Sequence, residues 1–312
     1  MLLHQSDLAA WSRCPAEYGY RRAGVPGRTN SAAAYGSVMH HVLQGLERSL
    51  HEGRVKYKTK SPEFAAHFQA AVQVALETFV HYWNPNNIEV ITEPVPADGW
   101  LPRQGYAELR SRGLDAIRKY ADLIKYDDHE LLALEYGFVV PIDGTWDYDL
   151  DQPHLLGGSV DRLAARYFSR QLACCVDDYK TGKEQYRLRH NIQFTAYCYA
   201  TTKREFWHGW AGEDGFGPDR GEELFQRFDG KGRRGTWINM RTFKYQDAGW
   251  REAQDYARFA LAVDQIAASI KADIFPLTIS GDACTFCDYR KTCGGVGIPD
   301  EEYGDPRTAV AR

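Results

Sequence analysis

An apolar run that ends in charged residues constrains this chain more than any other stretch. Residues 171–176 are mostly apolar, and they lead into Asp177, Asp178, Tyr179 and Lys180 and then into a glycine-containing turn. A run of this length before such a turn predicts a buried β-strand. Side chains alternate between the faces of a strand, so Asp178 and Lys180 share one face, while Asp177 and Tyr179 share the other.

An acid and a lysine on one face of a core strand need a reason, because burying unpaired charge is costly. One interpretation is a local ion pair at the end of the strand. Another involves Asp161, in the preceding strand-like segment, since adjacent antiparallel strands would bring it close to Asp178. Two carboxylates with open coordination positions suit Mg²⁺ or Mn²⁺, and Lys180 would then orient a water or stabilise charge on a phosphate. Asp161 could instead pair with Arg162 or serve as a turn residue.

Hydrophobic spacing divides the chain into a helical first part and a mixed second part. Before residue 129, apolar residues recur at helical spacing, which predicts a short helix after Ser6, a helix from about Tyr35, and helices over 61–82 and 105–127. Beyond it, strand-like segments alternate with two predicted helices, over 189–202 and 250–271. The strand-like segments are 131–140, 155–168, 171–178 and 236–243. Residues 207–235 are rich in glycine and charge, and they predict a mobile loop.

We therefore expect a single α/β domain over residues 1–312, with a mixed β-sheet flanked by helices. Residues 1–128 would form a mainly helical part, 129–272 the sheet with its helices, and 273–312 a cysteine-rich C-terminal cap.

The charge balance limits how this chain could bind nucleic acid. The net charge of −4 provides no attraction by the whole molecule, so any such site must be a local basic groove. The candidates for such a groove are Arg13, Arg21, Arg22, Lys231, Arg233 and Arg234. The sequence has no apolar run of about 18 residues and no export leader, so we expect a cytoplasmic protein that does not contact a membrane.

The cysteines predict a second metal site. Seven cysteines without an export leader favour thiols or a metal site over a disulfide framework. Cys284, Cys287 and Cys293 lie close together near the C-terminus, and Cys14, which precedes a proline, is the candidate for a fourth ligand. Four thiolates suit a [4Fe-4S] cluster and Zn²⁺ equally well.

Four short motifs occur in the order typical of the RecB-like branch of the PD-(D/E)XK nuclease superfamily. They are Gly36-x3-His40, Gly158-x2-Asp161-Arg162, Asp178-x-Lys180-Thr-Gly and Gln193-x3-Tyr197. The chain resembles that family over nearly its whole length, which implies a restriction-endonuclease-like fold and metal-dependent hydrolysis of DNA. The chain contains no phosphate-binding loop of the G-x4-GK[ST] type, so it carries no recognisable ATP motor.

The resemblance also implies a role for individual residues. His40, Asp161, Asp178 and the Tyr179 carbonyl would bind Mg²⁺ or Mn²⁺, and Lys180 would be catalytic. Gln193 and Tyr197 would line the active site and touch DNA. His40 is chosen over His41 by its distance from Gly36, and Asp178 over Asp177 by its distance from Lys180.

The cysteine pattern is similar to the iron–sulfur staple of AddB-type nucleases and of small CRISPR-associated adaptation nucleases. This resemblance favours a structural [4Fe-4S] cluster held by Cys14, Cys284, Cys287 and Cys293. It also implies a free-standing exonuclease that acts on single-stranded DNA or DNA ends, in a host cytoplasm if phage-borne. Partner proteins of recombination or CRISPR-type machinery would fit such an enzyme, although the sequence does not show them. The rival hypothesis is a non-catalytic DNA-binding subunit of a helicase–nuclease complex.

Overall fold

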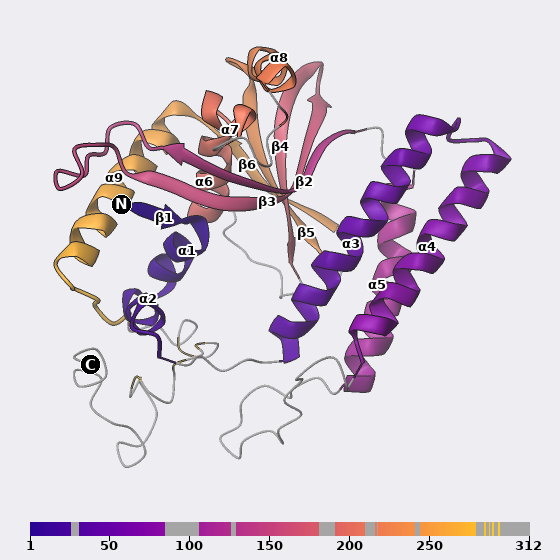
Figure 1. The fold of residues 1–312 in the computed structure, drawn as a ribbon, viewed down its shortest axis with the longest axis horizontal. Helices are drawn as coiled ribbons and strands as arrows, with labels where there is room; N and C mark the ends of the chain where they lie inside the picture. Colours follow the sequence, from indigo (N-terminus) through magenta and orange to yellow (C-terminus); the bar gives the residue numbers. More distant parts are fainter. Residues whose placement is uncertain are drawn as a thin grey trace.

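The structure is a computed structural model that describes residues 1–25, 31–84, 106–125, 129–180, 191–209, 216, 218–240, 244–278 and four separate positions, 284, 287, 289 and 293. The described residues form a six-stranded mixed sheet at the centre of the molecule (Figure 1). Its strands are β1 (Leu2–His4), β2 (Glu130–Pro141), β3 (Leu155–Phe168), β4 (Gln171–Lys180), β5 (Gly232–Asn239) and β6 (Lys244–Arg251). The order is β1-β3-β4-β5-β6, and β2 also pairs with β3.

Strand β3 changes partners along one of its edges. On that edge, residues 155–157 pair with β1 in parallel, and residues 162–168 pair with β4 in the antiparallel sense. Strand β2 follows the other edge along most of its length. A gap is therefore left between β1 and β4, beside the part of β3 that runs from Gly158 to Asp161.

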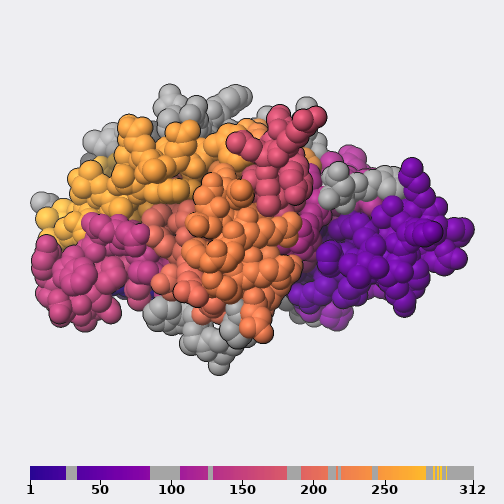
Figure 2. Space-filling model, turned by 90° about the horizontal axis from the view of Figure 1, so that it is seen from above, coloured from indigo at the N-terminus to yellow at the C-terminus, as the bar shows by residue number. Residues whose placement is uncertain are grey.

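Helices cover the sheet on two sides (Figure 1). One side carries α1 (Gln5–Arg13), α2 (Pro15–Arg22), α6 (Ile192–Ala200), α7 (Arg204–His208), α8 (Pro218–Phe228) and α9 (Ala253–Lys271). The other side carries a helical arm made of α3 (Ser31–Lys56), α4 (Pro62–Tyr82) and α5 (Tyr106–Ile124). Figure 2 shows this arm as a lobe at one end of the molecule. No helix among the described residues is long and apolar enough to cross a membrane.

Each side of the sheet has its own hydrophobic core. The first contains Leu163, Val176 and Phe194, and so joins β3 and β4 to α6. The second fills the helical arm and includes Tyr179 of β4 and Ile238 of β5. The apolar stripe of the arm therefore packs directly against the strands that carry the charged motif.

Local sequence accounts for the tight packing of the arm. Helix α4 begins where Ser61 accepts a hydrogen bond from the Phe64 N–H, followed by Pro62 in the first turn. Gly113 of α5 faces Phe79 of α4 so closely that a Cβ at this position would lie 2.1 Å from the ring. The absent side chain allows the two helices to approach.

The predicted α/β fold with a mixed sheet flanked by helices is confirmed, but several elements differ. The predicted strands 131–140, 155–168 and 171–178 match β2, β3 and β4 within two residues. The loop predicted over 207–235 is wrong, since that range contains the whole of α8 and the start of β5. Helix α1 has His4 rather than Ser6 at its N-cap. Most of the predicted C-terminal cap lies outside the described residues, and the domain limits stay a prediction.

Candidate metal centre

The predicted site residues of β3 and β4 come together where the two strands part. The β3–β4 ladder ends at the pair Arg162–Asp177. Beyond it, Asp161 Oδ2 accepts a hydrogen bond of 2.8 Å from the backbone N–H of Tyr179. The Asp161 carboxylate thus accepts the Tyr179 N–H, which a longer β3–β4 ladder would have paired with the backbone. This carboxylate lies at the gap in the edge of β3.

His40 reaches this point from helix α3. Its Nε2 lies 3.0 Å from the carbonyl oxygen of Tyr179, and its Nδ1 lies 3.5 Å from Asp161 Oδ2. His41 is exposed, and its ring packs against Tyr82 with centroids 4.8 Å apart. The structure therefore brings His40, and not His41, to the side of Asp161.

Sequence reasoning missed a third potential ligand, Glu135 of β2. Its neighbours pair with β3 as Leu134–Arg162 and Tyr136–Val160, which places Glu135 across from Asp161. Its Oε1 lies 3.7 Å from His40 Nδ1, and one ligand atom from each of His40, Glu135 and Asp161 lies within 4.8 Å of the other two.

One sequence feature could have drawn attention to Glu135. It is the only charged residue between positions 131 and 140, in an otherwise apolar run. Its backbone also has φ 49°, in the left-handed region that is costly for a non-glycine residue and that clusters at functional sites.

Asp178 and Lys180 form the ion pair that the alternation of the strand predicts. Lys180 Nζ lies 2.8 Å from Asp178 Oδ1 and 2.7 Å from Oδ2. Asp178 is 1% exposed, whereas the Lys180 side chain remains 35% exposed. The lysine can therefore meet an incoming molecule while it balances a buried acid.

The carboxylates of this site repel one another. Burial and then the charge of Asp178 raise the pKa of Asp161 to about 7. Burial alone would lower the pKa of His40, but the contact with Glu135 and the charges of Asp161 and Asp178 raise it. Burial likewise opposes a charged Lys180, yet Asp178 and Asp161 raise its pKa. A bound cation would relieve this excess of negative charge.

The donor atoms at this site fit a metal ion, and two of their oxygens accept no hydrogen bond of normal geometry. Glu135 Oε1 and Asp178 Oδ2 are buried without a hydrogen bond of normal geometry, although Lys180 lies near the second. A buried acceptor without a donor is costly. Carboxylate and carbonyl oxygens together with an imidazole suit a divalent cation such as Mg²⁺ or Mn²⁺.

Gln193 and Tyr197 of α6 lie beside the same carboxylates. Gln193 Nε2 donates to the Tyr197 hydroxyl at 3.0 Å and to Gln5 Oε1 at 3.2 Å. Burial, Asp178 and Asp161 raise the pKa of Tyr197, so its hydroxyl stays protonated close to them. Since that oxygen accepts from Gln193, its own proton is left for another acceptor.

The opposite faces of β3 and β4 hold a fully buried ion network. Arg162 Nε donates to Glu47 Oε2 of α3 at 3.0 Å, and Arg162 NH1 donates to Asp177 Oδ2 at 2.6 Å. Arg166 NH1 donates to Asp177 Oδ1 at 2.9 Å. Asp177 therefore faces away from Asp178, as alternation predicts, and this network anchors α3 to the sheet.

The cysteines predicted to bind a cluster approach one another. Cys14, Cys287 and Cys293 pack with Tyr20 and Tyr289, whose rings stack 5.6 Å apart. The pKa of Cys293 is raised by burial and then by the charges of Cys14 and, more weakly, Cys284, so the fourth thiol also lies near. Among the described residues, no three of these sulfur atoms lie within 4.8 Å of one another.

The structure places Arg233 in the protein interior, which contradicts the expectation that it lines a DNA groove. Arg233 is 3% exposed, and its guanidinium donates to Thr201 and to the Phe228 carbonyl. Its neighbour Arg234 pairs with Asp247, while Lys231 is exposed.

The N-terminal arginines lie near the surface. Arg13 Nε donates to Glu17 Oε2 at 2.7 Å, and Arg21 NH2 lies 3.7 Å from Glu17 Oε1. Arg22 is exposed. Any contact of these residues with DNA stays a prediction.

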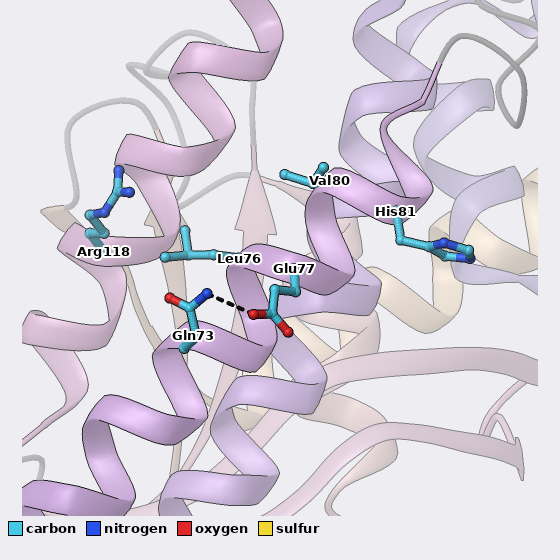
Figure 3. Close-up of a pocket in the computed structure, with 6 residues that line it drawn as sticks. All are labelled: Gln73, Leu76, Glu77, Val80, His81 and Arg118. Atoms are coloured by element: carbon cyan, nitrogen blue, oxygen red, sulfur yellow. Dashed lines mark hydrogen bonds between the residues drawn. The ribbon is translucent and has the colours of Figure 1, made fainter.

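A separate groove lies on the helical arm, between α4 and α5 (Figure 3). Gln73 Nε2 donates to Glu77 Oε1 at 2.7 Å inside it. It shares no residue with the metal centre, and its lining residues are Gln73, Leu76, Glu77, Val80, His81 and Arg118.

Comparison with known proteins agrees with this geometry. The family model of the PD-(D/E)XK nuclease superfamily matches residues 3–294. A comparison with curated proteins finds no match.

Proposed function

The chain belongs to the PD-(D/E)XK nuclease superfamily, whose members are divalent-metal-dependent nucleases, and on that premise we propose that it is an exonuclease acting on single-stranded DNA or DNA ends. The observation that carries the catalytic part is that His40 lies beside Asp161, while Lys180 pairs with Asp178, whose charge acts on Asp161. A non-catalytic DNA-binding subunit would not require these four residues.

In this proposal His40, Asp161, Asp178 and the Tyr179 carbonyl hold Mg²⁺ or Mn²⁺, and Glu135 joins them. When bound, the ion would polarise the scissile phosphate and lower the pKa of an attacking water. Its fit rests on the buried Glu135 oxygen that accepts no hydrogen bond and on the mutual repulsion of the acids.

The remaining residues would bind and orient the substrate. Lys180 keeps its proton because neighbouring acids raise its pKa, so it acts as a positive group that stabilises charge on the phosphate rather than as a base. Gln193 and Tyr197 offer polar hydrogens beside the carboxylates, where they would contact the DNA backbone. The preference for strand ends rests on the motif resemblance.

We also propose that Cys14, Cys284, Cys287 and Cys293 hold a structural [4Fe-4S] cluster. The packing of Cys14, Cys287 and Cys293 with Tyr20 and Tyr289 supports a common site. The choice of a [4Fe-4S] cluster over zinc rests on the resemblance of the cysteine pattern to the iron–sulfur staple of AddB-type nucleases. Such a cluster would join the α1–α2 junction to the C-terminal segment.

The test is hydrolysis of single- and double-stranded DNA labelled at the 5′ or the 3′ end, with Mg²⁺ or Mn²⁺, using anaerobically purified protein. Lys180→Ala and Asp178→Ala should abolish cleavage, and His40→Ala should weaken it, while the matched control His41→Ala should cut like wild type. The label released first gives the polarity. A wild type that binds DNA without cutting it, or variants that cut equally well, would refute the catalytic assignment and favour the binding-subunit hypothesis.

A further inference from the structure

We propose that Gln5, the first residue of α1, is a positioning residue that holds Gln193 and Tyr197 against the substrate. This inference rests on the proposed nuclease function and adds a residue that none of the four motifs contains. Three observations carry it: the register of β1, the contact with Gly158, and the hydrogen bond to Gln193.

The register of β1 delivers Gln5 to the gap beside β3. Leu2, Leu3 and His4 pair in parallel with Leu155, Leu156 and Gly157. The next residue, Gln5, therefore comes level with Gly158, at the point where β1 ends and before β4 begins to pair with β3. The same gap contains the Asp161 carboxylate, three residues further along β3.

Gly158 makes room for the Gln5 side chain. A Cβ at position 158 would lie 2.6 Å from Gln5 Cγ and 3.0 Å from Phe138 Cζ. Real Cβ atoms do not approach other atoms so closely, and this backbone has no positive φ that would itself demand glycine. The glycine of the Gly158-x2-Asp161 motif is thus explained by the close approach of Gln5.

The amide of Gln5 then fixes the orientation of Gln193. Gln5 Oε1 accepts one hydrogen of the Gln193 amide at 3.2 Å, while the Tyr197 oxygen accepts from the same nitrogen at 3.0 Å. With both contacts made, the Gln193 amide cannot rotate without losing one of them. The Tyr197 hydroxyl proton is thereby directed away from Gln193, so Gln5 controls two groups that would touch DNA.

Two substitutions separate the hydrogen bond from packing. Gln5→Met keeps the side-chain length over Gly158 but removes the acceptor, whereas Gln5→Glu keeps an acceptor for Gln193. Gly158→Ala displaces Gln5 without changing it. The matched control is Gln73→Met, since Gln73 is also hydrogen-bonded to a neighbouring side chain (Figure 3) but is exposed on α4 and is not a residue of the metal centre.

We expect Gln5→Met to raise KM for single-stranded DNA about fivefold, the effect of about one neutral hydrogen bond. The kcat and the half-saturating Mg²⁺ concentration should change little, because Gln5 touches none of the proposed metal ligands. Gly158→Ala should show the same pattern, Gln5→Glu should restore most of the affinity, and Gln73→Met should match wild type. In a Gln193→Ala background, Gln5→Met should raise KM by less than about a further 1.5-fold, since the two residues act as one unit.

The same variants in a Lys180→Ala background, with fluorescence anisotropy of a labelled oligonucleotide, give the Kd without cleavage. Additive effects of Gln5→Met and Gln193→Ala, or an unchanged KM and Kd in Gln5→Met, would overturn the role of Gln5. Loss of metal affinity together with lower thermal stability would show a merely structural role and overturn it as well. If wild type binds DNA but never cuts it, only the nuclease function is refuted. The Kd values of the variants then still decide whether Gln5 and Gln193 act together. A wild type that does not bind DNA refutes both.

Discussion

Replacing Asp161 with asparagine should stabilise the metal-free protein while it abolishes activity. Burial and then the charge of Asp178 raise the pKa of Asp161 from 3.8 to about 7. Such a carboxyl binds its proton more tightly in the folded state, so the free energy of unfolding falls as the pH rises between these two values. Asparagine cannot ionise, and its side-chain oxygen can still accept the Tyr179 N–H.

The size of the effect follows from the pKa difference. One pKa unit corresponds to about 1.4 kcal/mol, so a shift of about three units destabilises the folded state by about 4 kcal/mol at pH 8. At pH 5.5 the destabilisation depends only on how far the pH lies above the unfolded-state pKa of 3.8, and it amounts to about 2 kcal/mol. Asp161→Asn should therefore raise the free energy of unfolding by up to about 4 kcal/mol at pH 8 and by about half as much at pH 5.5.

Denaturant unfolding in chelator, followed by tryptophan fluorescence at both pH values, measures this difference. The matched control is Asp177→Asn. That neighbouring acid is fully buried and paired with Arg162 and Arg166, so its neutralisation should cost about 3–5 kcal/mol. Saturating Mg²⁺ should reverse the order of wild type and Asp161→Asn, because only wild type binds the ion. A neutral or destabilising Asp161→Asn at pH 8, or a gain that does not shrink at pH 5.5, contradicts the reasoning.

Three further outcomes are expected. The half-saturating Mg²⁺ concentration for cleavage should rise up to about tenfold per pH unit below 7, because Asp161 must lose its proton to bind the ion; equal Mg²⁺ requirements at pH 6 and pH 8 would exclude this. Arg162→Met should lower the free energy of unfolding by about 3–5 kcal/mol in a denaturant titration, since it removes the guanidinium that pairs with the buried Glu47 carboxylate. Cys14→Ser should remove the brown colour and the absorption near about 400 nm and lower the Tm, yet keep Mn²⁺ binding at the metal centre; a colourless wild type containing zinc would refute the cluster.

Sequence patterns predicted those elements whose own residues decide their structure. The apolar run before Asp177 defined β4, and Ser61-Pro62 with its apolar stripe defined α4. Strand β6 lies at the edge of the sheet and carries mixed polar residues, so no alternation identified it. Helix α8 was missed because the sequence around it is rich in glycine and charged residues, although Leu224 and Phe228 are four residues apart and buried.

The candidate site was predicted only where a motif marked it. Motif spacing selected His40, Asp161, Asp178 and Lys180, and the structure places His40 beside Asp161 and Lys180 beside Asp178. Glu135 and Gln5 depend instead on which strand lies beside which, because the β2–β3 register brings one of them to the site and the β1–β3 register the other. The lone charge in an apolar run marks Glu135 but not the residue that it faces, and no local pattern marks Gln5.

Tyr179 shows why the helical arm cannot be trimmed away in a smaller engineered version of this protein. Its N–H binds Asp161, its carbonyl contacts His40 of α3, and its hydroxyl lies 2.9 Å from the Tyr120 hydroxyl of α5. Deleting α3–α5 would remove His40 and leave this hydroxyl and the Ile238 face of the sheet open to water. A minimal version must therefore keep α3 and α5, and also α4, whose Phe79 is buried against Gly113 of α5.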